Sequence, residues 1–224
     1  VIEQLILDYL PTDSIDQRHM FVSANRGHIM KYAVLQSNAI ITEENADKIL
    51  SHLDSFNRPE VLYLLFEKTD RIVWLNLFRS FWTMCDSCSL YHEEFKSILR
   101  SYDIEEIRSI THNDDDIEFY NSLPETFEVY RGTFNDSRFA GGISWTTDIK
   151  VAEFFQNGYE NFKNNGPMVF RYKFNMNDDK FNLLKEIAES GTSVLTRTVN
   201  KKDIFVNTNR GENEIFIIGE LHER

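Results

Sequence analysis

The pattern of hydrophobic and polar residues changes once along the chain, near Pro124. Before that point apolar residues recur at spacings of three and four, as in Ile29, Tyr32 and Ala33, which is typical of amphipathic helices. Residues with turn chemistry interrupt this pattern at Pro11, Gly27, 57–59 and the acidic run 112–116. We therefore expect a series of short helices, one of them over 43–54 with Thr42 as its N-cap.

After Pro124 the apolar residues alternate with polar ones, beginning with "TFEVYRG" at 126–132. The alternation and its breaks predict strands over 126–132, 143–145, 168–174, 193–198, 203–207 and 214–219, and helices over 148–156 and 180–188. Helices followed by strands favour an α+β fold, in which an all-helical lobe packs on a mostly antiparallel sheet. We expect two domains, a helical lobe over 1–123 and a sheet-containing core over 124–224.

Charge separates the same two halves. Residues 1–123 hold 11 Lys and Arg against 21 Asp and Glu, a net charge of −10, whereas residues 124–224 hold 13 against 15, a net charge of −2. The acidic lobe disfavours unspecific binding to nucleic acid or to an anionic membrane and favours basic partners. The longest apolar runs, such as "VLYLLF" at 61–66, are far too short to cross a bilayer.

The chain has two cysteines, Cys85 and Cys88, spaced as CxxC in a predicted helix, with His92 one turn further on. A structural zinc site needs about four ligands, and no second pair of ligands follows. We interpret the cysteines as ordinary thiols of a reduced, cytoplasmic protein and expect no metal. A leader ahead of Val1 stays open, and with it a secreted or delivered effector.

Three motifs of the second half carry candidate chemistry. "VYRG" places Arg131 at the end of a predicted strand, and "GISWTTDIKVAEFF" places Ser144 and Thr146 at a corner between a strand and a helix. "GENEIF" places Glu212 and Glu214 at the opening of the last strand. In this order and in these strand contexts, the motifs resemble the R-S-E class of NAD-dependent ADP-ribosyltransferases, which includes cholera-like and arginine-modifying toxins.

The resemblance covers about residues 124–220. It implies a split β-sheet core of the ADP-ribosyltransferase type and an NAD-dependent mono-ADP-ribosyltransferase that acts as a toxin or effector. NAD is then the substrate, and no metal is implied. It further implies that Glu214 hydrogen-bonds a hydroxyl of the nicotinamide ribose, and that a loop between the helix at 148–156 and the strand at 168 covers NAD, with Tyr159 and Phe162 as candidate aromatic walls.

The chemistry explains the residue types. Cleavage of the nicotinamide–ribose bond builds positive charge on the sugar, which a fixed carboxylate such as Glu214 stabilises. Arg131 has the planar N–H donors that suit a diphosphate, and Gly132 lets the backbone approach the nicotinamide amide closely. We expect Ser144 to orient Glu214 and Thr146 to support the same corner. Trp145, on the opposite face of the strand, is expected in the core.

Glu212 bears on the acceptor. In family members that modify arginine, the first acid of Glu-x-Glu faces the incoming guanidinium and helps to hold or deprotonate it. The acid therefore favours arginine of a protein as the acceptor. A nucleic-acid base, or water in plain NAD hydrolysis, stays open.

Simpler interpretations also stay open. Arg131 is then a surface ion-pair residue, Ser144 and Thr146 cap the following helix, and the two glutamates form a solvated strand start. In that case the chain is an inactive binding module. Its acidic helical lobe leaves room for an antitoxin or immunity partner.

Overall fold

The structure is a computed structural model that describes most of the chain from Gly27 to Ile218. Outside the described residues lie 1–26, 28, 38–39, 86–87, 136–141, 166–181, 183–185, 187–188, 212 and 219–224. The chain forms two compact units, Val1–Tyr91 and His92–Arg224. The boundary therefore lies ahead of the change in sequence pattern at Pro124, and three helices that we grouped with the helical lobe belong with the sheet.

The first unit is helical. Besides a helix over 29–36 it contains α3 (Glu43–Ser51), α4 (Arg58–Leu65), α5 (Arg71–Phe81), η1 (Trp82–Met84) and η2 (Cys88–Tyr91). Helix α5 buries Trp74, Phe78 and Phe81, which follow the spacing of three and four that the sequence pattern showed. The predicted helix over 43–54 is confirmed as α3, although it ends at Ser51. Thr42 occupies its N-cap position without a capping hydrogen bond from its side chain.

The two cysteines do not lie inside an α-helix. Cys85 follows η1 and Cys88 begins η2. Both are free thiols, and the Cys85 Sγ donates to the Phe81 carbonyl at 3.2 Å. Within the described part of the chain no group of three or more His, Cys, Asp or Glu side chains is placed to hold a metal ion. No helix among the described residues is long and apolar enough to cross a membrane.

The second unit begins with three short helices. These are α6 (His92–Arg100), α7 (Ile104–Thr111) and α8 (Asp114–Ser122). Asp103 caps α7 by accepting the Glu105 N–H at 2.8 Å. Asn113 and Asp116 form a reciprocal capping box at the start of α8, so the break predicted within 112–116 is confirmed and has a local cause.

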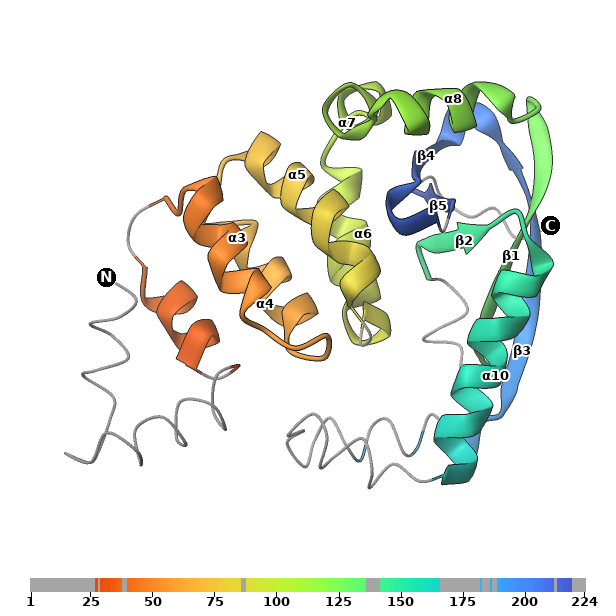
Figure 1. Cartoon of the computed structure of the whole chain (residues 1–224), viewed down its shortest axis with the longest axis horizontal. Helices are drawn as coiled ribbons and strands as arrows, with labels where there is room; N and C mark the ends of the chain where they lie inside the picture. Colours follow the sequence, from red (N-terminus) through yellow and green to blue (C-terminus); the bar gives the residue numbers. More distant parts are fainter. Residues whose placement is uncertain are drawn as a thin grey trace. The chain divides into compact units, whose positions relative to one another are not determined.

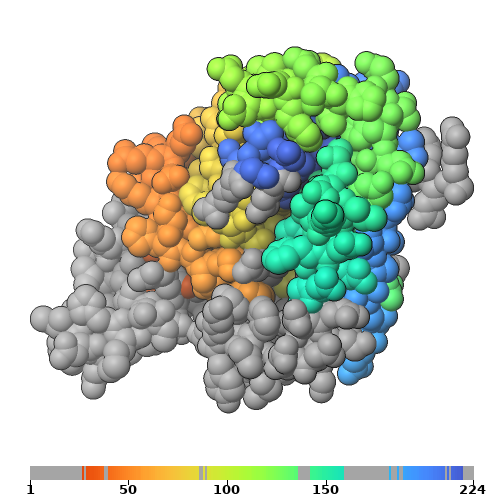
Figure 2. Space-filling model, turned by 45° about the vertical axis from the view of Figure 1, so that its right-hand side comes forward, coloured from red at the N-terminus to blue at the C-terminus, as the bar shows by residue number. Residues whose placement is uncertain are grey.

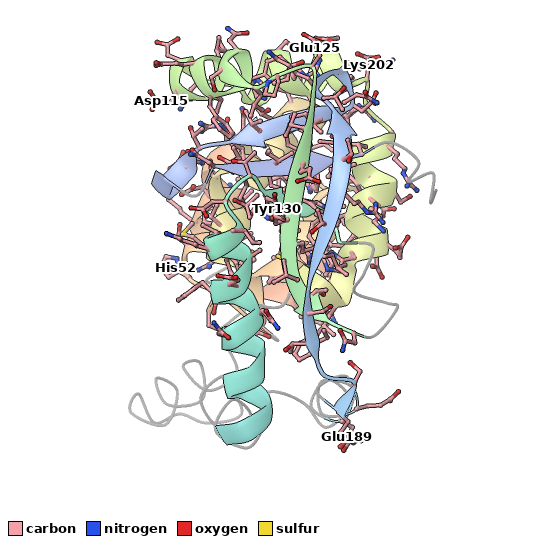
Figure 3. All side chains as sticks on the ribbon, turned by 90° about the vertical axis from the view of Figure 1, so that its right-hand side faces the viewer. His52, Asp115, Glu125, Tyr130, Glu189 and Lys202 are labelled. Carbon is pink, nitrogen blue, oxygen red and sulfur yellow. The ribbon has the colours of Figure 1, made fainter. Side chains whose placement is uncertain are left out.

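A five-stranded antiparallel sheet follows, in the order β3-β1-β2-β5-β4 (Figure 1). Its strands are β1 (Thr126–Phe134), β2 (Ser144–Thr146), β3 (Thr192–Asn200), β4 (Ile204–Asn207) and β5 (Glu214–Ile217). Strands β1 and β3 pair along their whole length, and Figure 3 shows them side by side with Tyr130 midway along β1. Strands β1 and β2 share a single pair, Tyr130 with Thr146. All the expected strands within the described residues are thus present, and no end differs from its expected position by more than two residues.

The two faces of the sheet are covered differently. One face carries an apolar core of Val129, Trp145, Val199 and Ile215, against which Phe119 and Leu123 of α8 and its C-terminal flank pack. The helix α10 (Ile149–Asn165) packs along β1 (Figure 1). A side chain at Gly132 would put its Cβ 2.0 Å from the Ala152 carbonyl oxygen of α10. The glycine therefore allows the helix to lie directly on the strand.

Strand β4 is an edge strand of the described sheet. Side chains of α7, of its C-cap residue His112 and of α8 bind groups on the outer side of β4 and of Thr208 just beyond it. Arg108 Nε donates to the Ile204 carbonyl at 3.0 Å, and the Val206 N–H donates to His112 Nε2 at 3.2 Å. The Thr208 N–H and hydroxyl both donate to Asp116 Oδ1 at 2.7 Å. The three side chains come from positions four residues apart, and the groups that they bind belong to positions two residues apart, 204, 206 and 208. We call Arg108, His112 and Asp116 the edge ladder.

Helix α10 corrects one expectation. We expected a helix over 148–156 followed by a polar loop, but α10 continues to Asn165. Tyr159 and Phe162 therefore belong to a helix and not to a loop, and their side chains lie outside the described residues. The strand expected over 168–174 also lies outside them, and of the helix expected over 180–188 only residues 182 and 186 are described, both helical.

Candidate active site

Ser144 and Glu214 meet at the centre of the sheet. Strands β2 and β5 pair in the register that sets Ser144 opposite Phe216 and Thr146 opposite Glu214. Residues opposite each other share a face, so Ser144 lies diagonally across from Glu214. The Ser144 hydroxyl donates to Glu214 Oε1 at 2.7 Å. The predicted contact between these residues, 70 positions apart, is therefore present in the structure.

The backbone ahead of Glu214 fixes where the carboxylate begins. Gly211 has φ +72° and Asn213 has φ +47°, the left-handed region that Gly and Asn tolerate best. Asn213 thus turns the chain into β5, and Glu214 is the first residue of that strand. On the neighbouring strand Asn207, fully buried, pairs with Glu214. The carboxylate consequently starts between two polar residues, Thr146 on β2 and Asn207 on β4.

Arg131 joins the same group through its guanidinium. It donates one N–H to the Ser144 carbonyl oxygen, and its NH2 group lies 3.2 Å from His92 Nε2. A Cβ at Gly142 would lie 2.2 to 2.5 Å from guanidinium atoms of Arg131. The glycine therefore leaves the space that the guanidinium occupies. We call Arg131, Ser144, Glu214 and His92 the site network.

His92 is the member of the site network that we did not predict. It is 3% exposed at the first position of α6, and no motif in the sequence links it to Arg131. Burial, and next the positive charges of Arg131 and Lys96, hold the pKa of His92 well below its usual range. The imidazole is therefore neutral at physiological pH.

Thr146 and Trp145 have the supporting roles that we expected. The Thr146 hydroxyl accepts the Asp148 N–H at 3.1 Å, and Asp148 Oδ1 accepts the Lys150 N–H at 2.9 Å, which shapes the corner into α10. Trp145 is 2% exposed and donates its indole N–H to the Gly142 carbonyl at 2.7 Å. Asp148 thus caps α10, Thr146 stabilises the turn ahead of that cap, and Ser144 points to Glu214 instead.

The structure gives no support to a ligand-binding role at two of the predicted positions, Gly132 and Glu212. Gly132 has a packing reason, the close approach of α10, which needs no ligand to explain it. Glu212 lies outside the described residues. In Figure 2 the blue atoms of the last described strands lie between the green atoms of α7 and α8 and the teal atoms of α10.

The arrangement provides a carboxylate of fixed orientation, that of Glu214, and a guanidinium, that of Arg131, which both bind Ser144. The Ser144 hydroxyl donates to the Glu214 carboxylate, and the Ser144 carbonyl oxygen accepts from the Arg131 guanidinium. Ser144 therefore links the two charged groups. Glu214 and Ser144 are both partly exposed. Such a carboxylate can stabilise positive charge that develops on a bound ligand.

No protein-family model matches the chain, and neither a curated protein nor a solved structure is detectably similar to it.

Proposed function

We propose that this protein is a mono-ADP-ribosyltransferase that cleaves NAD at the nicotinamide–ribose bond. The observation that carries the proposal is the hydrogen bond from Ser144 to Glu214, with Arg131 bound to the same serine. These are the arginine, serine and glutamate that give the resemblance to the R-S-E class in the sequence. The finer fold that goes with this proposal is the split β-sheet core of that class.

Each member of the triad has one task in this proposal. The Glu214 carboxylate stabilises the positive charge that forms on the ribose as nicotinamide departs. Ser144 holds Oε1 so that the carboxylate is preorganised before the reaction begins. Arg131 places a positive charge beside the same corner, which favours a ligand that carries a diphosphate. Strand β5 supports Glu214 on a paired backbone, which limits its movement.

The acceptor is inferred from Glu212 and from the net charge of the chain. A carboxylate two residues ahead of the catalytic one favours arginine of a protein, because a guanidinium must be bound and deprotonated before it can attack. The net charge of −12 is consistent with a basic protein as the target and unfavourable for a nucleic acid. A nucleic-acid base and water are the other acceptors that the test distinguishes.

The test is incubation of the full chain with labelled NAD and a cell lysate. Transfer to protein predicts label that protease releases and nuclease does not. Label released by nuclease identifies a nucleic acid as the acceptor, and free nicotinamide without bound label identifies hydrolysis. If the wild-type chain neither transfers label nor forms nicotinamide, the enzymatic proposal fails.

The variant that tests the site is Glu214→Gln, which keeps the shape and removes the charge. We expect NAD cleavage to fall about 100- to 1000-fold, the usual cost of losing one preorganised electrostatic group. The matched control is Glu125→Gln, at an exposed position just ahead of β1 (Figure 3). Near-normal cleavage by Glu214→Gln would remove the catalytic role from Glu214.

A further inference from the structure

His92 connects α6 to the site network. The first residue of α6 and the middle of β1 are 39 positions apart in the sequence, yet His92 Nε2 and the Arg131 NH2 group are 3.2 Å apart. Both residues belong to the second unit. The contact therefore forms only when α6 packs beside β1.

The donors and acceptors fix the tautomer of His92. A guanidinium has N–H groups and no acceptor, so the contact requires a lone pair on Nε2. The ring proton is then on Nδ1, and the imidazole is neutral. A protonated ring would instead point an N–H at Arg131 and place two positive charges in contact.

Three groups together confine the Arg131 guanidinium. His92 accepts from one of its nitrogens, the Ser144 carbonyl oxygen accepts from another, and Gly142 lies against it without a side chain. An arginine side chain has many rotamers, and each immobilised one costs entropy unless contacts of this kind fix it. Arg131 therefore lies in one place relative to Ser144, and Ser144 in turn holds Glu214.

We propose that His92 is a positioning residue for NAD cleavage: as a neutral acceptor it fixes the Arg131 guanidinium, and through Ser144 it helps to fix the Glu214 carboxylate. This inference rests on the proposed function. It assigns to α6 a part in the site that the sequence motifs do not include. It also makes the site sensitive to acid, because protonation of His92 removes the acceptor that Arg131 requires.

The charged groups that face the His92 ring are Arg131 from β1 and Lys96 from its own helix. Lys96 is almost buried and pairs with the exposed Glu93 at 2.7 Å. Both facing groups are positive. They oppose protonation of the ring, so the neutral form persists well below the ordinary histidine range.

Two variants separate the acceptor from the ring. His92→Gln keeps an amide oxygen that can accept from Arg131, whereas His92→Leu has no acceptor. At pH 7 we expect His92→Leu to lose about 10- to 100-fold in NAD cleavage, the loss typical for a hydrogen bond to a charged group, and His92→Gln to stay within about threefold of wild type. As the pH falls, wild type should lose a part of its activity that His92→Gln keeps. Equal loss in both variants, with both folded, would make His92 merely structural and overturn the proposal.

Gly142→Ala tests the same position without touching His92. The added methyl group would displace the guanidinium, which is the end of a flexible side chain, so the fold has a way to accommodate it. We expect cleavage to fall about 10-fold or more with little change in thermal stability. Unchanged cleavage would show that the place of the guanidinium does not matter, and with it the positioning role of His92 would be lost.

Nitrogen-15 NMR of the histidine rings in the wild-type chain gives a readout that does not depend on activity. We expect His92 to be neutral at pH 7 with its proton on Nδ1, and its Nε2 signal to shift in Arg131→Met. A proton on Nε2, or a charged ring, would overturn the proposal. If the wild-type chain cleaves no NAD, the proposed function fails on its own, and the NMR spectrum still decides whether His92 binds Arg131.

Discussion

Two groups of polar side chains in the second unit contain the same kinds of residue but bind different partners. The edge ladder contains an arginine, a histidine and an acid, and each of them binds backbone groups at the edge of β4 or just beyond it. The site network also contains an arginine, a histidine and an acid. Its members bind mainly one another, and the series ends at the carboxylate of Glu214, at the start of a strand.

The difference shows that residue type alone does not identify a site. Asp116 is completely buried, and its hydrogen bonds go to Thr208 and Asn113, so its charge serves the fold. Glu214 is partly exposed and receives its orientation from a serine. Part of the Glu214 residue is open to solvent although its Oε2 atom is buried, and a carboxylate held in place at such a position is the one suited to chemistry.

The largest difference in stability and in NAD cleavage should lie between variants of Asp116 and Glu214. Asp116→Ala should lower the free energy of unfolding by about 3 kcal/mol, because the Thr208 and Asn113 N–H groups lose their buried carboxylate acceptor. Glu214→Ala should change the unfolding free energy by less than about 1 kcal/mol and lower NAD cleavage about 100- to 1000-fold. Urea unfolding followed by circular dichroism and an assay for released nicotinamide measure the two effects. A large loss of stability in Glu214→Ala would contradict the comparison.

The two arginines come next. Arg108 donates to the carbonyl groups of Lys201, Lys202 and Ile204, so Arg108→Met should cost about 3 kcal/mol of unfolding free energy. Arg131→Met should cost less stability, about 1 to 2 kcal/mol, and weaken NAD binding and cleavage about 10-fold or more. Urea unfolding and calorimetric titration with NAD give the two quantities. Unchanged NAD affinity in Arg131→Met would exclude its proposed role toward the diphosphate.

His92 predicts how stability depends on pH. Its pKa is depressed in the folded chain, so below about pH 6.5 the unfolded chain takes up a proton that the folded chain does not. The free energy of unfolding should therefore fall with falling pH, at most by about 1.4 kcal/mol per pH unit from this residue. His92→Gln should remove that part of the slope. If the free energy of unfolding had the same dependence on pH in wild type and in His92→Gln, the ring would not be kept neutral by the fold.

The smallest difference should lie between Ser144 and Thr146, two residues apart on one strand. Ser144→Ala removes the hydroxyl that holds Glu214 and should reduce cleavage about 10-fold with little effect on stability. Thr146→Val removes the acceptor for the Asp148 N–H and should cost about 1 kcal/mol of stability, with cleavage less affected. The same two assays suffice. The opposite assignment of effects would return Ser144 to a capping role.

The strands could be predicted because they depend on local pattern, whereas the contact between Ser144 and Glu214 is one that the family resemblance suggested. Alternation marked the strands, and their observed ends lie within two residues of those expected. The order of the strands was not predicted, since pairing between distant strands depends on how the whole sheet packs. The motif order alone suggested that residues 131, 144 and 214 converge.

Other features could not be predicted from local pattern. Helices α6 to α8 have the same periodicity as those of the first unit, so the sequence did not show that their polar side chains bind β4. Gly158 and its polar neighbours indicated a loop, but Gly158 is exposed and packing of α10 against β1 and β3 outweighs the roughly 1 kcal/mol that a helical glycine costs. Asp116 belongs to an acidic run that suggested a solvated turn, and only the fold buries it.

The edge ladder has a practical consequence for anyone who shortens this protein. A fragment that began at Pro124 would retain the five strands that the structure describes, yet it would lack Arg108, His112 and Asp116. The outer backbone of β4 would then be open to pairing with the same strand of another molecule, a common route to insoluble aggregates. A recombinant fragment meant to stay dispersed should start ahead of His92.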